Sequence, residues 1–531
     1  MKSLVGRAMA WLGPWRRPEV LAGQLGVVLL LSLVWDVLLA FDNTPAILGS
    51  SPLAVVLTVV LYPVMVATAA VTIAAPGRIP RLMAVGRHLL ALARPLLLVA
   101  AATLLAQVPS LIAARSPVSD DVTPSIICAA RDTIRGHDPY QTPELRCLRS
   151  LGLPPSLGIA LRAGPYAADA LPPSPARAAA VSGAASRFGY RTRAYPVFGY
   201  PPVSFLWMLP VAQLGRSWWV AWTLAWAVVW VLAVARLAGQ WWPGALAILL
   251  MQWGTGSVLG AATQGDAEFF AFALMSLALL TLSRPRTSSL ALGLAIGTNP
   301  LAWVMAPAYL MLALRLPARG RRLKWLVGTL LLAFVPWLLL FPDALGSMLK
   351  LLTQPAYPVG TGLVALSIVQ PLLPLLPRAA YFALLAAGEA AVLGAAAASR
   401  RAAAVAPILA ISVLWLGWRS DANYLAQLPL LAGAMVIGLE QLRPTSPGPL
   451  PEISRTTSQR SGVGARGKRR LHVGTERAVD AWRWAKQALN PRPPRCKRGA
   501  LPLSYSPIWR CVQAPQSGRP PGSGRARGWS R

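Results

Sequence analysis

The chain has 531 residues, of which 55% are hydrophobic and 13% are charged, and its formal net charge at pH 7 is +33. Soluble domains carry about 25% charged residues, so this composition and the mean hydropathy of +0.50 exclude an ordinary soluble protein. They indicate a polytopic membrane protein, because each helix that crosses a bilayer needs about 20 mostly apolar residues.

The apolar runs predict an all-α polytopic membrane protein with a bundle of about 11–13 transmembrane helices. The first run follows the basic stretch MKSLVGRAMAWLGPWRR. It is too long for a signal-peptide core and has no clear cleavage site, which predicts an uncleaved anchor. The predicted spans cover residues 20–41, 50–75, 88–114, 217–238, 243–263, 266–283, 288–314, 325–341, 361–376, 380–398, 403–417 and 423–440.

Basic residues in the early loops predict the orientation, because such residues stay on the cytoplasmic side of a membrane. The N-terminus and the loop PGRIPRLMAVGR are basic, whereas FDNTPAILGS between them has no Lys or Arg. This order predicts that the third span delivers a large polar loop, residues 116–200, to the extracytoplasmic face. Carboxylates held there against a membrane suggest a lipid-borne substrate.

The stretch 288–314 has basic clusters at both ends, SRPRTSS before it and RLPARGRRLKW after it. A pair of short helices that turns back at GTNP explains this pattern, with Gly297 and Pro300 supplying the break. Broken backbone at membrane depth is tolerated only where protein or a water-filled cavity satisfies it. One kinked span, at which the charge rule fails locally, explains the pattern equally well.

Residues 441–531 are rich in Pro, Gly and Arg and carry about half of the net charge. This composition predicts a disordered, basic cytoplasmic tail. Adhesion to anionic lipid headgroups, or no function at all, is the expected role. Nucleic acid is not an expected partner, because the chain has no recognisable nucleic-acid-reading module.

Four cysteines, Cys128, Cys147, Cys496 and Cys511, form no metal-binding motif, since they lack close pairs and clustered histidines. We therefore expect no zinc. Cys128 and Cys147 lie in the same extracytoplasmic loop, where an oxidising compartment permits a disulfide. A disulfide and two free thiols both remain open from the sequence.

Several short motifs follow one another in an order that suggests a family. The polar loop opens on Asp120 and Asp121, continues through a short helix ending GHDPY, and closes with RTRAYPVFGYPP. TQGDAEFF, LALGLAIGTNPLAWVM and WRSDANYLAQLPLL follow. This order, over residues 90–440, resembles glycosyltransferase family 87 of the polyprenol-phosphate-dependent GT-C superfamily. Two features depart from the family: Asn299 stands where a basic residue is common, and two extra spans precede the loop.

The resemblance implies three parts: an N-terminal two-span extension, residues 1–87; a GT-C-like catalytic domain, residues 88–440; and the tail. It also implies a hexosyltransferase that moves a hexose (mannose-like) or a pentose from a polyprenyl phosphate to a hydroxyl of a glycolipid or glycan acceptor. No cofactor and no metal are expected. The expected location is a prokaryotic plasma membrane, with the catalytic loop outside.

Such a transfer needs a base for the acceptor hydroxyl and positive charge for the departing phosphate. Asp121 matches the loop-opening aspartate of the family best and is our candidate base, with Asp120 as the close alternative. One or both instead cap the helix that begins near Pro124, since Asp is favoured at helix N-termini. A direct displacement inverts the anomeric centre.

The candidate substrate-binding residues come from the same motifs and from the loop arginines. Several of them can instead have a structural role: Asp138 and Tyr140 in a turn, Arg419 in a salt bridge with Asp421, and Tyr200 as an interfacial anchor. The full set is Asp138, Tyr140, Arg191, Arg193, Tyr200, Gln264, Asp266, Asn299, Arg419 and Tyr424.

Two other functions compete with the transferase. A lipid or solute transporter or flippase also uses polytopic helices with a few buried charges, and it predicts inverted repeats and broken helices. A catalytically degenerate transferase is suggested by Asn299 and by the low-complexity tail.

Overall fold

The computed structural model describes part of the chain, and contacts divide the chain into two compact units, Met1–Gly448 and Pro449–Arg531. All described residues lie in the first unit. They are residues 18–42, 52–95, 97–98, 122–142, 147, 150–151, 159–161, 192–194, 198–250, 260–262, 265–353, 359–360, 362–368, 373–420 and 422–442.

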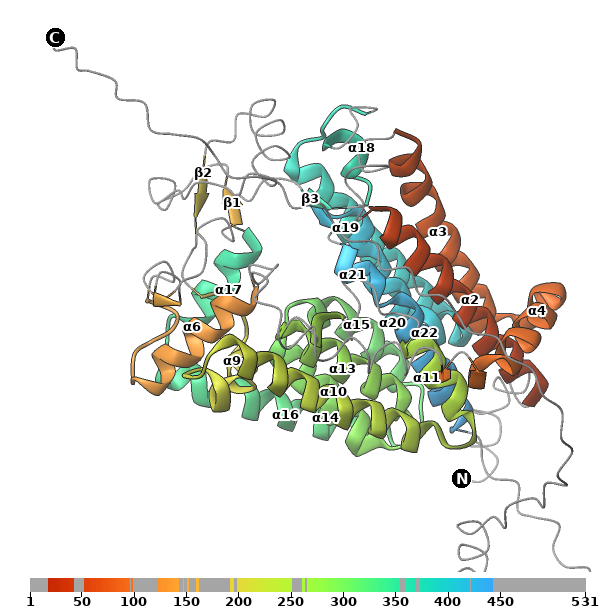
Figure 1. Cartoon of the computed structure of the whole chain (residues 1–531), viewed down its shortest axis with the longest axis horizontal. Coiled ribbons are helices and arrows are strands. Elements are labelled where there is room, and N and C mark those ends of the chain that lie inside the picture. The colour runs from red at the N-terminus through yellow and green to blue at the C-terminus, as the bar shows by residue number, and fades with distance from the viewer. Residues whose placement is uncertain are drawn as a thin grey trace, which may run out of the picture. The chain divides into compact units, whose positions relative to one another are not determined.

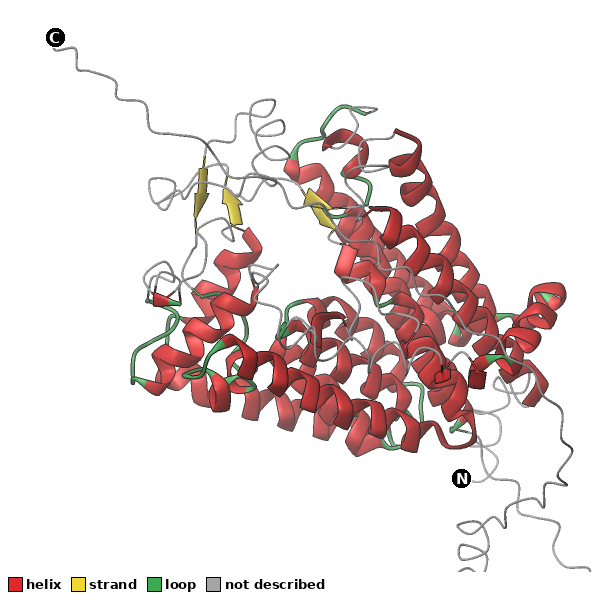
Figure 2. Ribbon diagram, in the orientation of Figure 1, coloured by secondary structure: helices red, strands yellow, loops and turns green. Residues whose placement is uncertain are grey.

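Helices make up most of the described chain, as Figures 1 and 2 show. The longer helices are α2 (Pro18–Asp42), α3 (Pro52–Ala74), α4 (Pro80–Ala91), α6 (Val122–Ile134), α10 (Arg216–Ala238), α11 (Trp242–Leu250), α13 (Glu268–Leu280), α14 (Pro285–Thr298), α15 (Leu301–Ala313), α16 (Arg319–Leu340), α17 (Ala344–Thr353), α19 (Arg378–Ala398), α20 (Arg400–Val413) and α22 (Leu428–Glu440). The short ones are η2 (Pro76–Arg78), α9 (Val203–Leu206), η5 (Leu209–Val211), η6 (Gly239–Trp241), α18 (Ala365–Ile368), η7 (Leu414–Leu416) and α21 (Ala422–Ala426).

Strands are confined to two short pairs among the described residues. Strand β1 (Ile159–Leu161) pairs antiparallel with β2 (Thr192–Ala194), and β3 (Val359–Gly360) pairs parallel with β4 (Arg419–Ser420). Each pair joins segments that are far apart in the sequence.

Four helical segments of the described chain are long and apolar enough to cross a membrane: Pro18–Trp35, Arg216–Leu250, Arg319–Leu340 and Arg378–Ala398. Together with the helical content, they confirm the prediction of an all-α membrane protein at this coarse level. Four of the α-helices, α2, α3, α4 and α14, begin with proline, which has the φ of a helix and lacks an N–H that the first turn cannot satisfy.

The predicted span at residues 361–376 is wrong. Helix α18 is only four residues long, and residues 373–377 are not helical. Pro374 and Pro377 lie in this stretch, and each lacks the N–H that a helix interior needs. The hydropathy of the segment is high, but its backbone cannot form one continuous helix.

Helices α14 and α15 form an antiparallel hairpin that turns at Asn299 and Pro300. The hydroxyls of Ser288, near the start of α14, and Tyr309, in α15, are hydrogen-bonded to each other. A continuous helix would hold these residues about 31 Å apart. Of the two alternatives for residues 288–314, the structure therefore has the pair of short helices, and both basic clusters lie at the same end of the hairpin.

Two glycines four residues apart let α14 pack closely against its neighbours. A Cβ at Gly293 would lie 2.7 Å from Cβ of Thr329 in α16, and a Cβ at Gly297 would lie 2.7 Å from Cγ2 of Val203. Small residues at this spacing allow close backbone approach in membrane helix packing. The glycines of the LALGLAIGTNP motif therefore determine how the hairpin seats on α16.

The predicted N-terminal extension packs into the same unit as the remaining described helices. Gln24 in α2 donates a hydrogen bond of 2.8 Å to the carbonyl of Thr72 in α3, and Ser32 donates one of 3.2 Å to Ile248 in α11. Figure 1 shows α2 and α3 beside α20 and α22, and residues of these helices are in contact. Helices from the two ends of the unit thus share one core.

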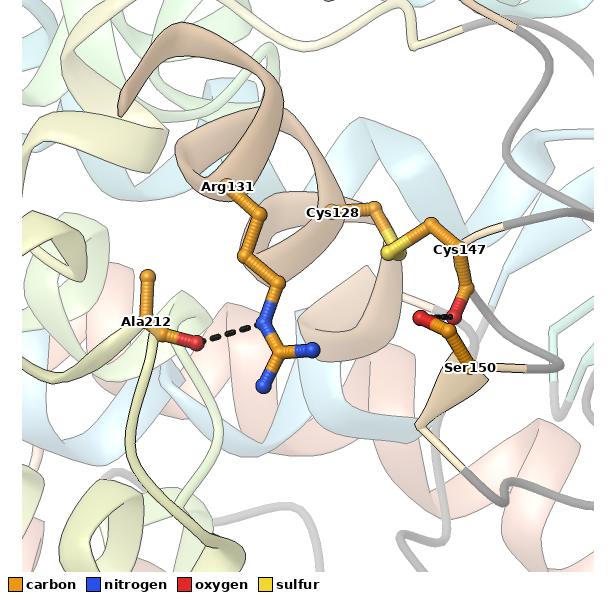
Figure 3. Close-up of a disulfide and its surroundings, with 5 residues drawn as sticks. All are labelled: Cys128, Arg131, Cys147, Ser150 and Ala212. Atoms are coloured by element: carbon orange, nitrogen blue, oxygen red, sulfur yellow. Dashed lines mark hydrogen bonds between the residues drawn. A yellow bond between two sulfur atoms is a disulfide. The ribbon is translucent and has the colours of Figure 1, made fainter. Parts of the chain in front are cut away.

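A disulfide joins Cys128 of α6 to Cys147, with the two Cα atoms 5.7 Å apart (Figure 3). Nε of Arg131, one turn further along α6, donates a hydrogen bond of 2.6 Å to the carbonyl of Ala212, which follows η5. The covalent bond and the hydrogen bond thus tie the short helix that opens the polar loop to two different segments of the chain.

We predict that Gly293→Ala lowers the stability of the protein by about 1–3 kcal/mol, because the added methyl group overpacks the contact with Thr329. Thermal unfolding of the purified chain in detergent measures the loss. Gly328→Ala in α16 is the matched control, since a Cβ there meets nothing within 4 Å. Equal melting temperatures for the two variants would contradict the packing argument.

We predict that replacing Cys128 and Cys147 by serine removes on the order of 3 kcal/mol of stability, as expected for a closed loop of about 20 residues. Peptide mapping without reduction should recover the two cysteines in one cross-linked peptide. The same double change at Cys496 and Cys511 should leave the melting temperature unchanged. A free thiol at Cys128 in the unreduced protein would show that the bond does not form.

Candidate functional site

One cavity of about 240 Å³ lies where several helix ends meet. The hairpin tip and the first turn of α13 form one part of its wall, and α19 and the segment around η7 and β4 form the other. The lining residues are Tyr200, Glu268, Asn299, Pro300, Leu301, Val304, Arg378, Tyr381, Phe382, Leu385, Leu414, Gly417, Trp418, Arg419 and Tyr424.

Asn299 at the hairpin tip satisfies the turn and also contacts the first turn of α13, on the same side of the cavity. Its Oδ1 accepts a hydrogen bond of 2.9 Å from the N–H of Leu301, and its Nδ2 donates one of 3.4 Å to Oε1 of Glu268. Both side chains are buried, with exposed fractions of 3% and 4%. The tip is therefore a polar contact in an apolar interior, and it holds a carboxylate at the cavity wall.

The segment before α13 places Glu268 at the cavity wall. Gly265 has φ of 76°, a left-handed conformation that favours glycine, and the chain turns there into α13. Asp266 then accepts a hydrogen bond of 2.7 Å from the N–H of Glu268. The hydroxyl of Thr123 donates to the same Oδ1 atom at 3.2 Å and accepts from the N–H of Ala267.

Two arginines bring positive charge to the cavity from different elements. Arg378 is the first residue of α19, and its guanidinium lies 5.1 Å from the ring centroid of Phe382. Arg419 is fixed by the pairing of β4 with β3, and Oγ of the next residue, Ser420, accepts a hydrogen bond of 2.9 Å from the N–H of Gly362. The cavity therefore combines two guanidinium groups with one carboxylate.

The remaining wall is aromatic and aliphatic. Tyr381 and Trp418 pack edge to face with centroids 5.5 Å apart, and Phe382 on the next position of α19 is 44% exposed. Only 11% of the most apolar stretch of α19 is buried. An apolar surface that reaches from the cavity onto an exposed helix suits an occupant with both a charged group and a hydrocarbon chain.

The structure brings four of the predicted substrate-binding residues together at this cavity: Tyr200, Asn299, Arg419 and Tyr424. Asp266 does not line the cavity and holds the start of α13 instead. Arg193 is described only through its backbone, which pairs with Ala160 in the β1–β2 ladder. The candidate bases Asp120 and Asp121, together with Arg191 and Gln264, lie outside the described residues.

Asp138 and Tyr140 form a turn next to the site without lining it. Oδ1 of Asp138 accepts a hydrogen bond of 2.8 Å from the N–H of Tyr140. Burial raises the pKa of Asp138, and that hydrogen bond opposes the shift. The Tyr140 hydroxyl donates to the carbonyl of Tyr200 at 3.1 Å, and its ring packs on Phe198. Tyr140 therefore positions Tyr200 at the cavity.

Sequence reasoning missed Glu268 and Arg378. Glu268 lies two positions after Asp266 in the TQGDAEFF motif, and a second carboxylate in an apolar stretch was a signal that deserved equal weight. Arg378 follows Pro377 at the start of an apolar helix, the usual place of an interfacial anchor, so nothing local separated it from other basic residues. Only its place opposite the hairpin tip distinguishes it.

The cavity combines groups that can bind an anion and a hydroxyl. Guanidinium groups form strong charge-assisted hydrogen bonds to anionic oxygens, and a buried carboxylate can accept hydrogen bonds from hydroxyl groups. Within the described ranges, no three His, Cys, Asp or Glu side chains gather in a way that could hold a metal ion. Comparison with protein families, with curated proteins and with solved structures found no match to this chain.

We predict that Asn299→Asp destabilises the protein by about 1–3 kcal/mol, because a donor to buried Glu268 becomes a second acceptor while the contact to Leu301 is kept. Adding Glu268→Gln should restore most of the stability, since the new amide can donate to the aspartate. Thermal unfolding is measured in detergent for the wild type, the two single variants and the double variant. The four values give the interaction free energy between Asn299 and Glu268. Strictly additive losses would mean that Asn299 and Glu268 do not interact.

Proposed function

We propose that this chain is an integral-membrane glycosyltransferase that moves a hexose or pentose from a polyprenyl-phosphate sugar to an acceptor hydroxyl. The observation that carries the proposal is the cavity in which Arg378 and Arg419 lie opposite Glu268 and Asn299, beside an exposed apolar helix. Four of the substrate-binding residues predicted from the sequence are among its lining residues.

The lining divides according to the parts of such a donor. The guanidinium groups suit the phosphate, the carboxylate and amide suit sugar hydroxyls, and Tyr381 and Trp418 offer ring faces to the sugar or the lipid. The exposed side of α19 suits the polyprenyl chain. This match of chemistry supports a donor that enters from the bilayer.

In the proposed reaction, a carboxylate removes the proton of the acceptor hydroxyl as the oxygen attacks the anomeric carbon. The bond from that carbon to the phosphate oxygen breaks, and the electron pair leaves with the polyprenyl phosphate. The attack comes from the face opposite the leaving group, so the configuration inverts. Arg378 and Arg419 stabilise the charge that develops on the phosphate.

Asp121, with Asp120 as the alternative, is the proposed base. Two peptide units separate Asp121 from Thr123, a reach of about 7 Å, and Thr123 is hydrogen-bonded to Asp266 two residues before Glu268. The loop therefore begins close to the cavity wall. A disulfide in the same loop supports an oxidising, extracytoplasmic side for the reaction.

A transporter remains the second candidate because of one observation, the broken α14–α15 hairpin. Short helices whose ends meet inside the bundle are typical of transporters, where they surround the substrate. The polar loop with its disulfide and its aspartates has no evident use in transport, which is why we rank the transferase first.

We predict that the purified chain in nanodiscs transfers sugar from at least one member of a panel of labelled polyprenyl-phosphate sugars. Asp121→Asn should lower the rate at least a hundredfold, as expected for loss of a general base. Arg378→Gln and Arg419→Gln should each lower it about a hundredfold, because one group that stabilises the leaving phosphate is lost. Scintillation counting of the transferred label measures each rate.

Arg401→Gln is the matched control, an exposed arginine at the start of α20 beyond the opposite end of α19. Glu268→Gln tests the assignment of the base: loss of activity there, with full activity in Asp121→Asn and Asp120→Asn, would move the base to Glu268. An inactive wild type that carries the donor lipid across a vesicle membrane would replace the transferase with the transporter.

A further inference from the structure

Trp207, directly after α9, contacts both elements that form the polar side of the cavity. Its Nε1 donates a hydrogen bond of 3.1 Å to Oγ1 of Thr298, the last residue of α14 and the neighbour of Asn299. Its ring stacks on Phe270, with centroids 4.9 Å apart and an interplanar angle of 4°. Phe270 lies two positions after Glu268 in α13. One side chain therefore touches the hairpin tip and the first turn of α13 at the same time.

The direct contact between Asn299 and Glu268 is too long to define the separation of these residues by itself. Their hydrogen bond measures 3.4 Å between Nδ2 and Oε1, whereas N–H···O bonds in proteins are about 2.7–3.2 Å long. A bond of this length constrains the two side chains less than a bond of ordinary length does. The helices that carry the two residues must therefore be held by other contacts as well.

Thr298 transmits the position of Trp207 to the hairpin tip. Its hydroxyl donates to the carbonyl of Leu294 at 2.8 Å and accepts from Trp207, so its hydrogen and one lone pair are both used. The side chain is buried, with an exposed fraction of 2%. A hydroxyl that is bonded on both sides and surrounded by protein has little freedom to rotate. It therefore fixes the last turn of α14 immediately before Asn299.

Helix α10 in turn fixes Trp207. Nε1 of Trp222 donates a hydrogen bond of 2.8 Å to the carbonyl of Trp207. The ring of Trp226 packs edge to face on Trp207, with centroids 5.5 Å apart, and on Phe270, at 6.3 Å. The rings of Trp207, Trp226 and Phe270 thus form one packed group. Of these three, Trp207 alone is hydrogen-bonded to the hairpin in the part of the chain that the structure describes.

The separation of the hairpin tip from α13 affects the cavity beside it. Asn299 and Glu268 line the cavity, as do Arg378 and Arg419, whereas Trp207 does not. A shift of the tip therefore moves the amide relative to the carboxylate and to the guanidinium groups. In catalysis, a displacement of about 1 Å that originates away from the reacting groups can cost on the order of a hundredfold in rate. A side chain outside the cavity can thus control the reaction inside it.

We propose that Trp207 is a positioning residue, which sets the separation of Asn299 and Glu268. Its hydrogen bond to Thr298 fixes the hairpin tip, and its stacking on Phe270 fixes the start of α13. The effect on rate rests on the proposed transferase function, whereas the separation itself is a property of the fold. Loss of the indole N–H should lower kcat more than it raises KM, because the groups that bind the donor remain and only their alignment in the transition state changes.

Sugar transfer by the full chain in nanodiscs tests the effect on rate. Trp207→Phe should lower kcat about tenfold and change the KM of the polyprenyl-phosphate sugar less than about threefold. Trp226→Phe is the matched control, since it makes the same change in the same group of rings and leaves the hydrogen bond to the hairpin intact. Its kcat should stay close to that of wild type. Thr298→Val should reproduce the loss, whereas Thr298→Ser, which keeps the hydroxyl, should retain the wild-type kcat.

A second measurement needs no activity. Thermal unfolding of the variants Asn299→Asp, Glu268→Gln and their double variant gives the interaction free energy between the two residues. This energy should fall by about half or more in a Trp207→Phe background and stay unchanged in a Trp226→Phe background.

The two measurements separate this proposal from the proposed function. An interaction free energy that Trp207→Phe leaves unchanged would overturn the positioning role, whether or not wild type transfers sugar. Equal kcat values for Trp207→Phe and Trp226→Phe, in an active wild type, would also overturn it, because the indole would then serve packing alone. An inactive wild type in which Trp207→Phe still lowers the interaction free energy would refute the transferase and support the position that Trp207 sets.

Discussion

Asn299 ends α14 inside the protein, where its backbone and its amide must be hydrogen-bonded without help from bulk water. Its side chain completes the turn through Leu301 and reaches Glu268 on another helix. A buried turn of this kind is stable only where a hydrogen-bond partner on a neighbouring helix satisfies its polar groups. The cavity follows from that pairing, since the tip that approaches α13 also forms the wall facing Arg378 and Arg419.

The arginines at the two ends of the hairpin have different partners. At the tip, arginines from α19 and β4 share a cavity with a carboxylate, so charge of both signs is present. At the other end, the buried Arg322 contacts the carbonyls of Pro317 and Leu282 and the hydroxyl of Tyr309, and the helix start beside it adds further positive potential. The first arrangement suits a substrate that carries a phosphate and a neutral sugar. The second is a group of cations in which no carboxylate contacts Arg322 among the described residues.

Close backbone contacts connect these two ends. Gly293 and Gly297 set the distance between α14 and its neighbours Thr329 and Val203. A shift of the hairpin would therefore move its tip and its opposite end together. The polar loop is attached to the same frame: the disulfide and Arg131 fix α6, and Thr123 at its start is bonded to Asp266. The segment that opens the proposed catalytic loop is therefore held by the helix that carries Glu268.

The sequence by itself determined the features that depend on neighbouring residues: the apolar helices, an interruption between Gly297 and Pro300 that could be a break or a kink, and the basic clusters on either side of it. It also selected Tyr200, Asn299 and Tyr424 through the motifs, and Arg419 through its expected place at the membrane surface. The predicted span at residues 361–376 was wrong, because hydropathy does not take account of prolines, which lack the backbone N–H that a helix needs. Only the tertiary structure decided that the hairpin turns back, that Cys128 pairs with Cys147, and that Glu268 and Arg378 share a cavity. Local pattern specifies helices, but contacts between remote residues are set by packing, which no single segment contains.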